Sequence, residues 1–123
     1  MRVLFAGGGT GGHLFPAFAV ARSVRQLHTD AEITWLGGGR GIESRLVPEE
    51  GYPLSLLAAP SLRPSGGGLR ASLVDGFKLL WSIPQAIGLI RRARPDVIFS
   101  TGGYIAIPTL IAAWLTRTPS LLW

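Results

Sequence analysis

The sequence predicts an α/β fold in which a parallel sheet carries helices on both faces. Two observations support this prediction: short apolar runs alternate with helical patterns along the 123 residues, and glycine clusters follow two of the apolar runs. Right-handed crossovers between parallel strands bring the carboxyl ends of all strands to one edge of the sheet. The glycine clusters are therefore expected at the edge where such folds bind ligands.

The first half of the chain is expected to hold three strands and two helices. Apolar runs at 3–6, 32–36 and 53–57 predict the strands. A helix is expected over 15–27, with Pro16 in its first turn and an apolar face made of Ala17, Val20, Val24 and Leu27. A shorter helix is expected over 42–50, closed by Gly51.

The second half begins with a loop at 59–68, which is rich in glycine, proline and serine. The long apolar segment at 69–93 is expected to form one kinked helix or two, because Pro84 interrupts the helical hydrogen bonds. Strands are then expected at 96–100 and at 120–123, on either side of a helix over 105–116.

Composition limits the possible partners and the compartment. Eleven arginines and one lysine stand against seven acids, which gives a net charge of +5 and suits an anionic partner, although arginine-rich usage alone would produce the same balance. With no cysteine and only His13 and His28, no metal site and no cofactor are expected. The unbroken apolar run at 105–115 is shorter than the roughly 20 residues of a membrane span, and glycine appears by Gly7, too early for a signal peptide. We therefore expect a cytoplasmic protein.

The first glycine cluster, "GGGTGGH", allows three interpretations. Gly7, Gly9 and Gly12 fit the dinucleotide pattern G-x-G-x-x-G, but glycines and Arg40 stand where the second strand should end in an acid. A nucleotide P-loop requires a lysine after its last glycine, and His13 stands there instead. The third interpretation is the capture of a diphosphate or sugar phosphate by backbone amides at a helix N-terminus, aided by the hydroxyl of Thr10.

His13 lies where the loop meets the helix, so it is expected to face the anion. It is interpreted as a general base or a phosphate contact, with a purely structural histidine as the alternative. His28, which ends a predicted helix, is expected to be structural.

The segment at 69–93 has an apolar arc wider than a core-facing stripe requires. We expect a patch made of Leu73, Phe77, Leu80 and Trp81 to contact an anionic membrane surface, because basic residues flank it. The alternative is a helix that neighbouring elements or a further domain bury on two sides.

The motif "GGTGGHLFPA" resembles the opening signature of the MurG family of bacterial N-acetylglucosaminyltransferases. The resemblance continues through "WLGGGRGIESRLVPEEGY", "SLRPSGG" and "RPDVIFSTGGYIAIPTLIAAW". It implies a Rossmann-like domain, the N-terminal half of a GT-B glycosyltransferase, with the acceptor and the membrane bound by residues 1–123. Ser100 and Thr101 depart from the family pattern, which often has another glycine before Gly-Gly-Tyr, and Ala106 stands where a serine is common.

The resemblance also implies a reaction: transfer of GlcNAc from UDP-GlcNAc to lipid I, at the cytoplasmic face of the bacterial membrane, without nucleic acid as a partner. It implies that His13 is catalytic and that the acceptor is bound by a set of loop residues, namely Gly8, Gly9, Thr10, Gly11, Gly12, His13, Gly102, Gly103 and Tyr104. The family's donor-binding domain is expected beyond "PSLLW". The alternative function is a non-catalytic membrane-docking subunit of a split GT-B enzyme.

Overall fold

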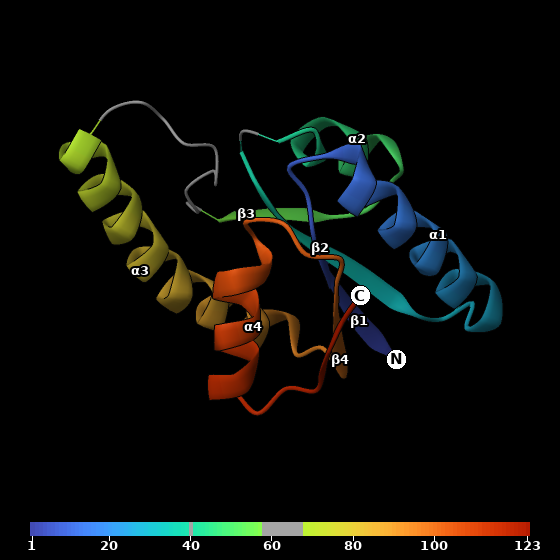
Figure 1. Cartoon of the computed structure of the whole chain (residues 1–123). Helices are drawn as coiled ribbons and strands as arrows, with labels where there is room; N and C mark the ends of the chain where they lie inside the picture. The colour runs from blue at the N-terminus through green and yellow to red at the C-terminus, as the bar shows by residue number, and fades with distance from the viewer. Residues whose placement is uncertain (40, 58–67) are drawn as a thin grey trace.

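A computed structural model describes residues 1–39, 41–57 and 68–123, without the side chains of residues 68, 71 and 72. Figure 1 shows strands and helices alternating along the chain. The strands are β1 (Arg2–Ala6), β2 (Glu32–Gly38), β3 (Leu54–Leu57), β4 (Val97–Ser100) and β5 (Ser120–Leu122). The helices are α1 (Gly11–Leu27), α2 (Glu43–Glu49), α3 (Gly68–Ala93) and α4 (Ala106–Leu115).

The five strands form one parallel sheet in the order β3-β2-β1-β4-β5. The chain first builds outward from β1 to β3, and then returns to the other side of β1 to add β4 and β5. The direction of winding therefore reverses between β1 and β4. In folds of this kind, the reversal opens a crevice at the carboxyl ends of the strands, and ligands bind there.

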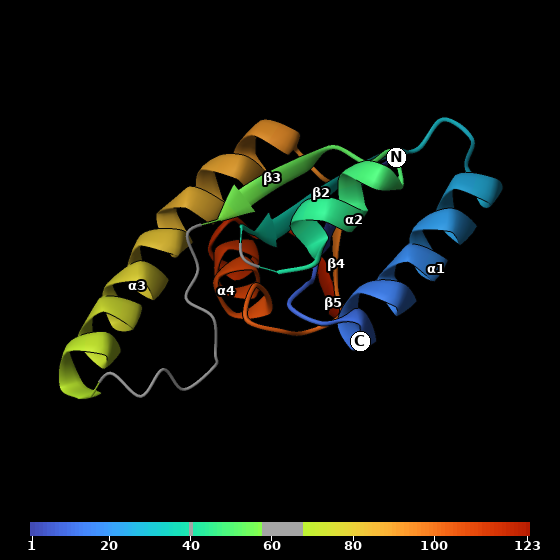
Figure 2. The same cartoon turned by 90° about the horizontal axis from the view of Figure 1, so that it is seen from above.

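Helices cover both faces of the sheet, as predicted. Alternate residues of β1 point to opposite faces: Val3 and Phe5 pack with α1 and α2, whereas Leu4 and Ala6 pack with α3 and α4. The first face holds an aromatic cluster in which the Trp35 ring stacks on Phe5 at 4.9 Å between centroids. Figure 2 shows the two pairs of helices on either side of the strands.

The described helices and strands are of the predicted types. The structure differs from the prediction in where some elements begin and in which residues form their buried faces. Helix α1 starts at Gly11 instead of residue 15, so Pro16 lies in the second turn and the expectation of a first-turn proline is wrong. The buried face of α1 is formed by Leu14, Ala17, Phe18 and Ala21, whereas Leu27 is 80% exposed and does not belong to it. The predicted loop at 59–68 lies outside the described residues, apart from Gly68, where α3 begins.

Helix α3 is a single helix with Pro84 inside it, so the two-helix alternative is wrong. Its stretch Leu73–Ala93 is long and apolar enough to span a membrane by length and composition, a test that core helices of soluble proteins also pass. The prediction from unbroken apolar runs overlooked this stretch because polar residues interrupt it. Only 17% of its most apolar window is buried.

Candidate functional site

The two glycine loops meet at the carboxyl edge of the sheet, where the strand order reverses. The first loop follows β1 and leads into α1, and the second follows β4 and leads into α4. Because β1 and β4 are hydrogen-bonded neighbours, with Ala6 paired to Ser100, both loops leave the sheet side by side. The structure thus brings together the two groups of residues that the sequence predicted as one site.

His13 joins the two loops. Its Nδ1 lies 2.7 Å from the carbonyl oxygen of Thr101. A carbonyl can only accept a hydrogen bond, so Nδ1 carries the proton when the ring is neutral, and Nε2 is then the basic nitrogen. The second loop therefore fixes both the orientation and the tautomer of His13, which leaves Nε2 able to accept a proton.

Glycine at position 103 allows the loops to approach this closely. Its φ is +85°, a region that side chains disfavour, and a Cβ added there would lie 2.7 Å from the carbonyl oxygen of Gly8. The same Cβ would lie 3.6 Å from Cδ2 of His13. Gly103 is therefore required by the backbone contact between the loops and by its positive φ, whereas the contact with the histidine ring would be an ordinary one.

The start of α1 lies beside His13. The amides of Gly11 and Gly12 belong to the first turn of α1, so no earlier helical carbonyl can accept from them. Thr10 is the N-cap residue, and its side chain makes no capping hydrogen bond. Backbone donors and the positive end of the helix dipole thus favour an anion at this position.

Sequence reasoning missed Glu43, which is fully buried directly beneath both loops. Its Oε2 accepts a hydrogen bond from the amide of Gly9 at 2.9 Å, and its Oε1 accepts from the amide of Gly38 at 3.0 Å. Oε1 also accepts from the hydroxyl of Tyr104 at 2.8 Å. The amide of Gly9 and the phenol of Tyr104 therefore form hydrogen bonds inside the protein. The family resemblance had implied that both residues bind the acceptor substrate.

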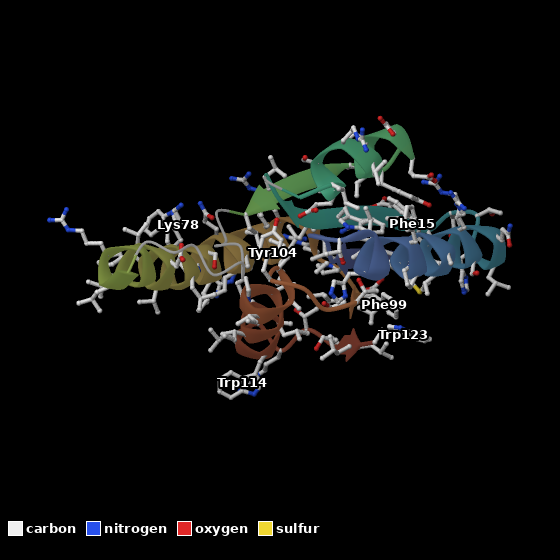
Figure 3. All side chains as sticks on the ribbon, turned by 45° about the horizontal axis from the view of Figure 1, so that its top comes forward. Phe15, Lys78, Phe99, Tyr104, Trp114 and Trp123 are labelled. Atoms are coloured by element: carbon white, nitrogen blue, oxygen red, sulfur yellow. The ribbon has the colours of Figure 1, made fainter. Side chains whose placement is uncertain are left out.

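Several glycines provide space for this carboxyl group. A Cβ added at Gly8, Gly37 or Gly41 would overlap Glu43, and one added at Gly38 would overlap the hydroxyl of Tyr104. Tyr104 lies in the middle of the molecule, at the meeting of α4 and the sheet (Figure 3). Part of the glycine richness therefore serves to bury Glu43. An acid four residues beyond the glycine run at 37–39 was the signal available in the sequence.

Glu43 also argues against the interpretation of the first glycine cluster as a dinucleotide-binding loop. The acid that such sites need near the end of the second strand would have to turn toward a ribose. Glu43, the acid that follows β2, is buried and turned toward Gly9 and Tyr104 instead.

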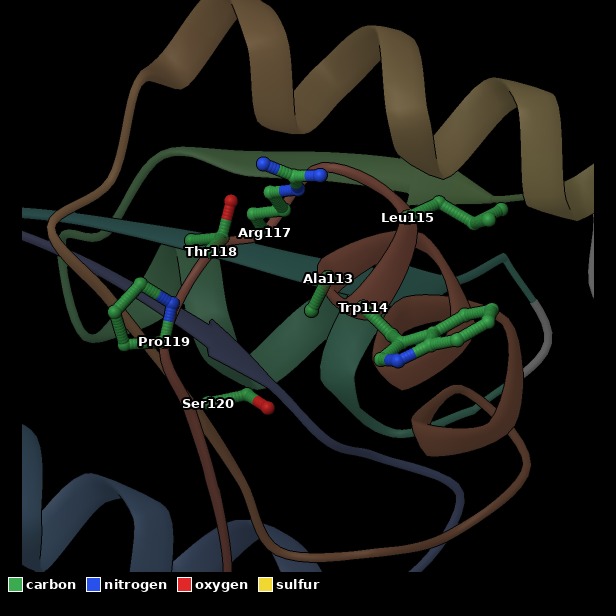
Figure 4. Close-up of a pocket in the computed structure, with 7 residues that line it drawn as sticks. All are labelled: Ala113, Trp114, Leu115, Arg117, Thr118, Pro119 and Ser120. Atoms are coloured by element: carbon green, nitrogen blue, oxygen red, sulfur yellow. The ribbon is translucent and has the colours of Figure 1, made fainter.

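Two surface hollows lie at the opposite, amino-terminal edge of the sheet. One adjoins the start of β5 and is lined by Ala113, Trp114, Leu115, Arg117, Thr118, Pro119 and Ser120 (Figure 4). The other is lined by Arg2, Gly88, Arg91, Arg92 and Arg94. Neither contains a residue of the glycine loops, so both are separate from the candidate site.

The fold and the position of the loops define the N-terminal domain of a GT-B glycosyltransferase. The solved structure of the Streptomyces glycosyltransferase SsfS6 shares the fold, with a TM-score of 0.68 and 17% identity over 99% of this chain and 38% of that chain. The sequence model of the glycosyltransferase family 28 N-terminal domain matches residues 3–122. The chain belongs to this family.

The resemblance to MurG is confirmed. The crystal structure of Acinetobacter baumannii MurG superposes with a TM-score of 0.81 and 30% identity, covering 98% of this chain and 34% of that chain. The chain is 43% identical over 99% of its length to a protein of Myxococcus xanthus and 46% identical over 99% to one of Alkalilimnicola ehrlichii. Both are named UDP-N-acetylglucosamine--N-acetylmuramyl-(pentapeptide) pyrophosphoryl-undecaprenol N-acetylglucosamine transferase. The chain covers 31% and 33% of these two relatives, about a third of their length.

Proposed function

We propose that this chain is the acceptor-binding part of an enzyme that transfers GlcNAc from UDP-GlcNAc to lipid I. The observation that carries the proposal is the hydrogen bond from His13 Nδ1 to the carbonyl oxygen of Thr101, at 2.7 Å, which leaves Nε2 as a base beside an anion-binding helix N-terminus. The similarity to the Myxococcus xanthus and Alkalilimnicola ehrlichii transferases supports the choice of substrates.

In the proposed reaction, the diphosphate of the acceptor lies against the first turn of α1, at the amides of Gly11 and Gly12. A hydroxyl of its sugar then faces His13. Nε2 of His13 takes the hydroxyl proton while the oxygen forms a bond to the anomeric carbon of GlcNAc. The bond from that carbon to UDP breaks, and its electron pair leaves with the diphosphate oxygen. Attack opposite the leaving group inverts the anomeric carbon and gives a β-linked product.

We also propose that α3 places this reaction at the cytoplasmic face of the bacterial membrane. The predicted patch residues Leu73, Phe77, Leu80 and Trp81 are each at least 60% exposed. Among the described side chains of α3, the buried ones are Ser82, Ala86 and Ile90. At about 100° per residue these two sets fall on opposite sides of the helix, so the patch faces away from the core.

Basic residues accompany the apolar patch. Arg70 is exposed near the start of α3, and Lys78 lies within the patch segment. Their charge supports contact with anionic lipid, which would bring the site to a membrane-anchored acceptor.

The test of this function uses a joined enzyme, defined as residues 1–123 followed by the part of the Myxococcus xanthus relative beyond the matched region. The joined enzyme should transfer GlcNAc from UDP-GlcNAc to lipid I, and residues 1–123 alone should not. Transfer of GlcNAc by residues 1–123 alone would contradict the proposal that the joined part of the Myxococcus xanthus relative binds the donor. A joined enzyme that folds and binds UDP-GlcNAc without transferring would favour the docking-subunit alternative.

A further inference from the structure

Glu43 is a buried acid that the proposed proton transfer does not use. We propose that it is a positioning residue, whose carboxylate holds the two glycine loops at the spacing that acceptor binding requires. This inference rests on the proposed function. It assigns to the site a residue that lies in neither loop.

Among the described residues, Glu43 accepts three hydrogen bonds, and they come from three different segments. Gly9 belongs to the first loop, Gly38 ends β2, and Tyr104 belongs to the second loop. Since Glu43 itself is the first residue of α2, one side chain ties both loops to the sheet and to a helix. The hydrogen bond from His13 to Thr101 ties the same two loops at a second point.

The chemistry of the position favours a carboxylate over other side chains. All three partners are neutral donors, and a carboxylate accepts at both oxygens. A glutamine of the same shape would direct an NH₂ group at one of these donors, which would leave two buried donors facing each other. The space that the glycines leave around Glu43 also excludes any larger replacement for them.

The position of Glu43 determines which parts of the loops remain for a ligand. It engages Gly9 and Tyr104 from inside the protein, whereas the amides of Gly11 and Gly12 lie at the start of α1 next to His13. Loss of the carboxylate would release the first loop from below. Acceptor binding should therefore suffer, whereas donor binding, which the remainder of the enzyme supplies, should not.

The experiment measures steady-state kinetics of the joined enzyme carrying Glu43→Gln, Tyr104→Phe or both. Glu49→Gln, an exposed acid on the same helix, is the matched control. We expect Glu43→Gln to raise the KM for lipid I by about tenfold, the loss typical of one broken buried hydrogen bond to a charged group. The KM for UDP-GlcNAc should stay at the wild-type value. The amide oxygen of a glutamine can still accept from Gly38 and Tyr104 at the position of Oε1, so Glu43→Gln breaks the bond to Gly9, whereas Tyr104→Phe breaks the bond from the phenol. The two increases in KM should therefore combine in the double variant.

Other outcomes would overturn the positioning role. A merely structural acid would reduce the fraction of active enzyme, which lowers kcat and leaves both KM values unchanged. A double variant with the same KM for lipid I as Glu43→Gln alone would contradict two separate contacts from Glu43 to the loops. If Glu43→Gln does not fold, Tyr104→Phe decides alone: a raised KM for lipid I supports the role, and an unchanged one refutes it. An inactive wild-type joined enzyme would instead refute the proposed function, and this inference with it.

Discussion

The side chain of His13 and the backbone of Thr101 are joined by a 2.7 Å hydrogen bond between residues 88 positions apart. His13 lies in the first turn of α1, just after the loop that follows β1, and Thr101 lies in the loop that follows the neighbouring strand β4. The sheet topology places the carbonyl group of Thr101 beside the ring of His13. The carbonyl accepts from Nδ1, which leaves Nε2 as the basic nitrogen.

Gly103→Ala should destabilise the protein and abolish transfer by the joined enzyme. The new Cβ would lie 2.7 Å from the carbonyl oxygen of Gly8, in addition to the strain of φ +85°. Gly51→Ala is the matched control, because its φ is +86° and no described residue comes within 4 Å of the added Cβ. Urea unfolding should show a loss of about 1 kcal/mol for Gly51→Ala from strain alone, and a larger loss for Gly103→Ala. Equal losses in the two variants would contradict the close contact between the loops.

Gly12→Ala should weaken acceptor binding without weakening the fold. Within the described chain, the added Cβ would meet only Oγ1 of Thr10 at 3.7 Å, so the helix can accommodate it. Alanine also favours the helical conformation by about 0.5–1 kcal/mol over glycine. The melting temperature should therefore stay the same or rise, while the KM for lipid I should increase because the methyl group enters the space proposed for the diphosphate.

The control for that experiment is Gly88→Ala, at an exposed position within α3 where the added Cβ would have no neighbour within 4 Å in the part of the chain that the structure describes. It should stabilise the protein to a similar degree and leave both KM values unchanged. A Gly12→Ala enzyme with the wild-type KM for lipid I would place the diphosphate elsewhere.

Trp81→Ser should reduce binding of the joined enzyme to lipid vesicles. Trp81 is 64% exposed, and in the proposed membrane contact it supplies an apolar contribution that salt does not screen. Co-sedimentation of the parent enzyme should increase with the fraction of anionic lipid and decrease with salt, since each nearby basic residue contributes about 1 kcal/mol. Trp81→Ser should lower binding even at low salt.

Leu27→Ser is the control for the membrane experiment, because Leu27 is 80% exposed at the end of α1, on the other side of the sheet from α3. It should bind vesicles as the parent enzyme does. Equal binding to neutral and anionic vesicles, or equal effects of the two substitutions, would show that α3 does not form the membrane contact.

The sequence was sufficient to predict the fold and the proximity of the two glycine loops. The periodicity of apolar residues and the positions of turn residues indicate directly where strands and helices lie and in which order. It was insufficient for Glu43 and for the carbonyl of Thr101. The carboxylate is recognised by three donors from segments far apart in the chain, and a backbone carbonyl carries no residue signature. Boundaries also depended on tertiary contacts: glycines that read as a loop form the first turn of α1.

The central claim is that His13 acts as the general base through Nε2. The most direct measurement is kcat of the joined enzyme carrying His13→Gln, with the exposed His28→Gln as the control. Glutamine keeps a hydrogen-bond donor but cannot take a proton at neutral pH. If His13 is the general base, kcat should fall roughly 10²–10⁴-fold in His13→Gln and stay unchanged in His28→Gln. A kcat for His13→Gln close to that of the wild type would contradict the account.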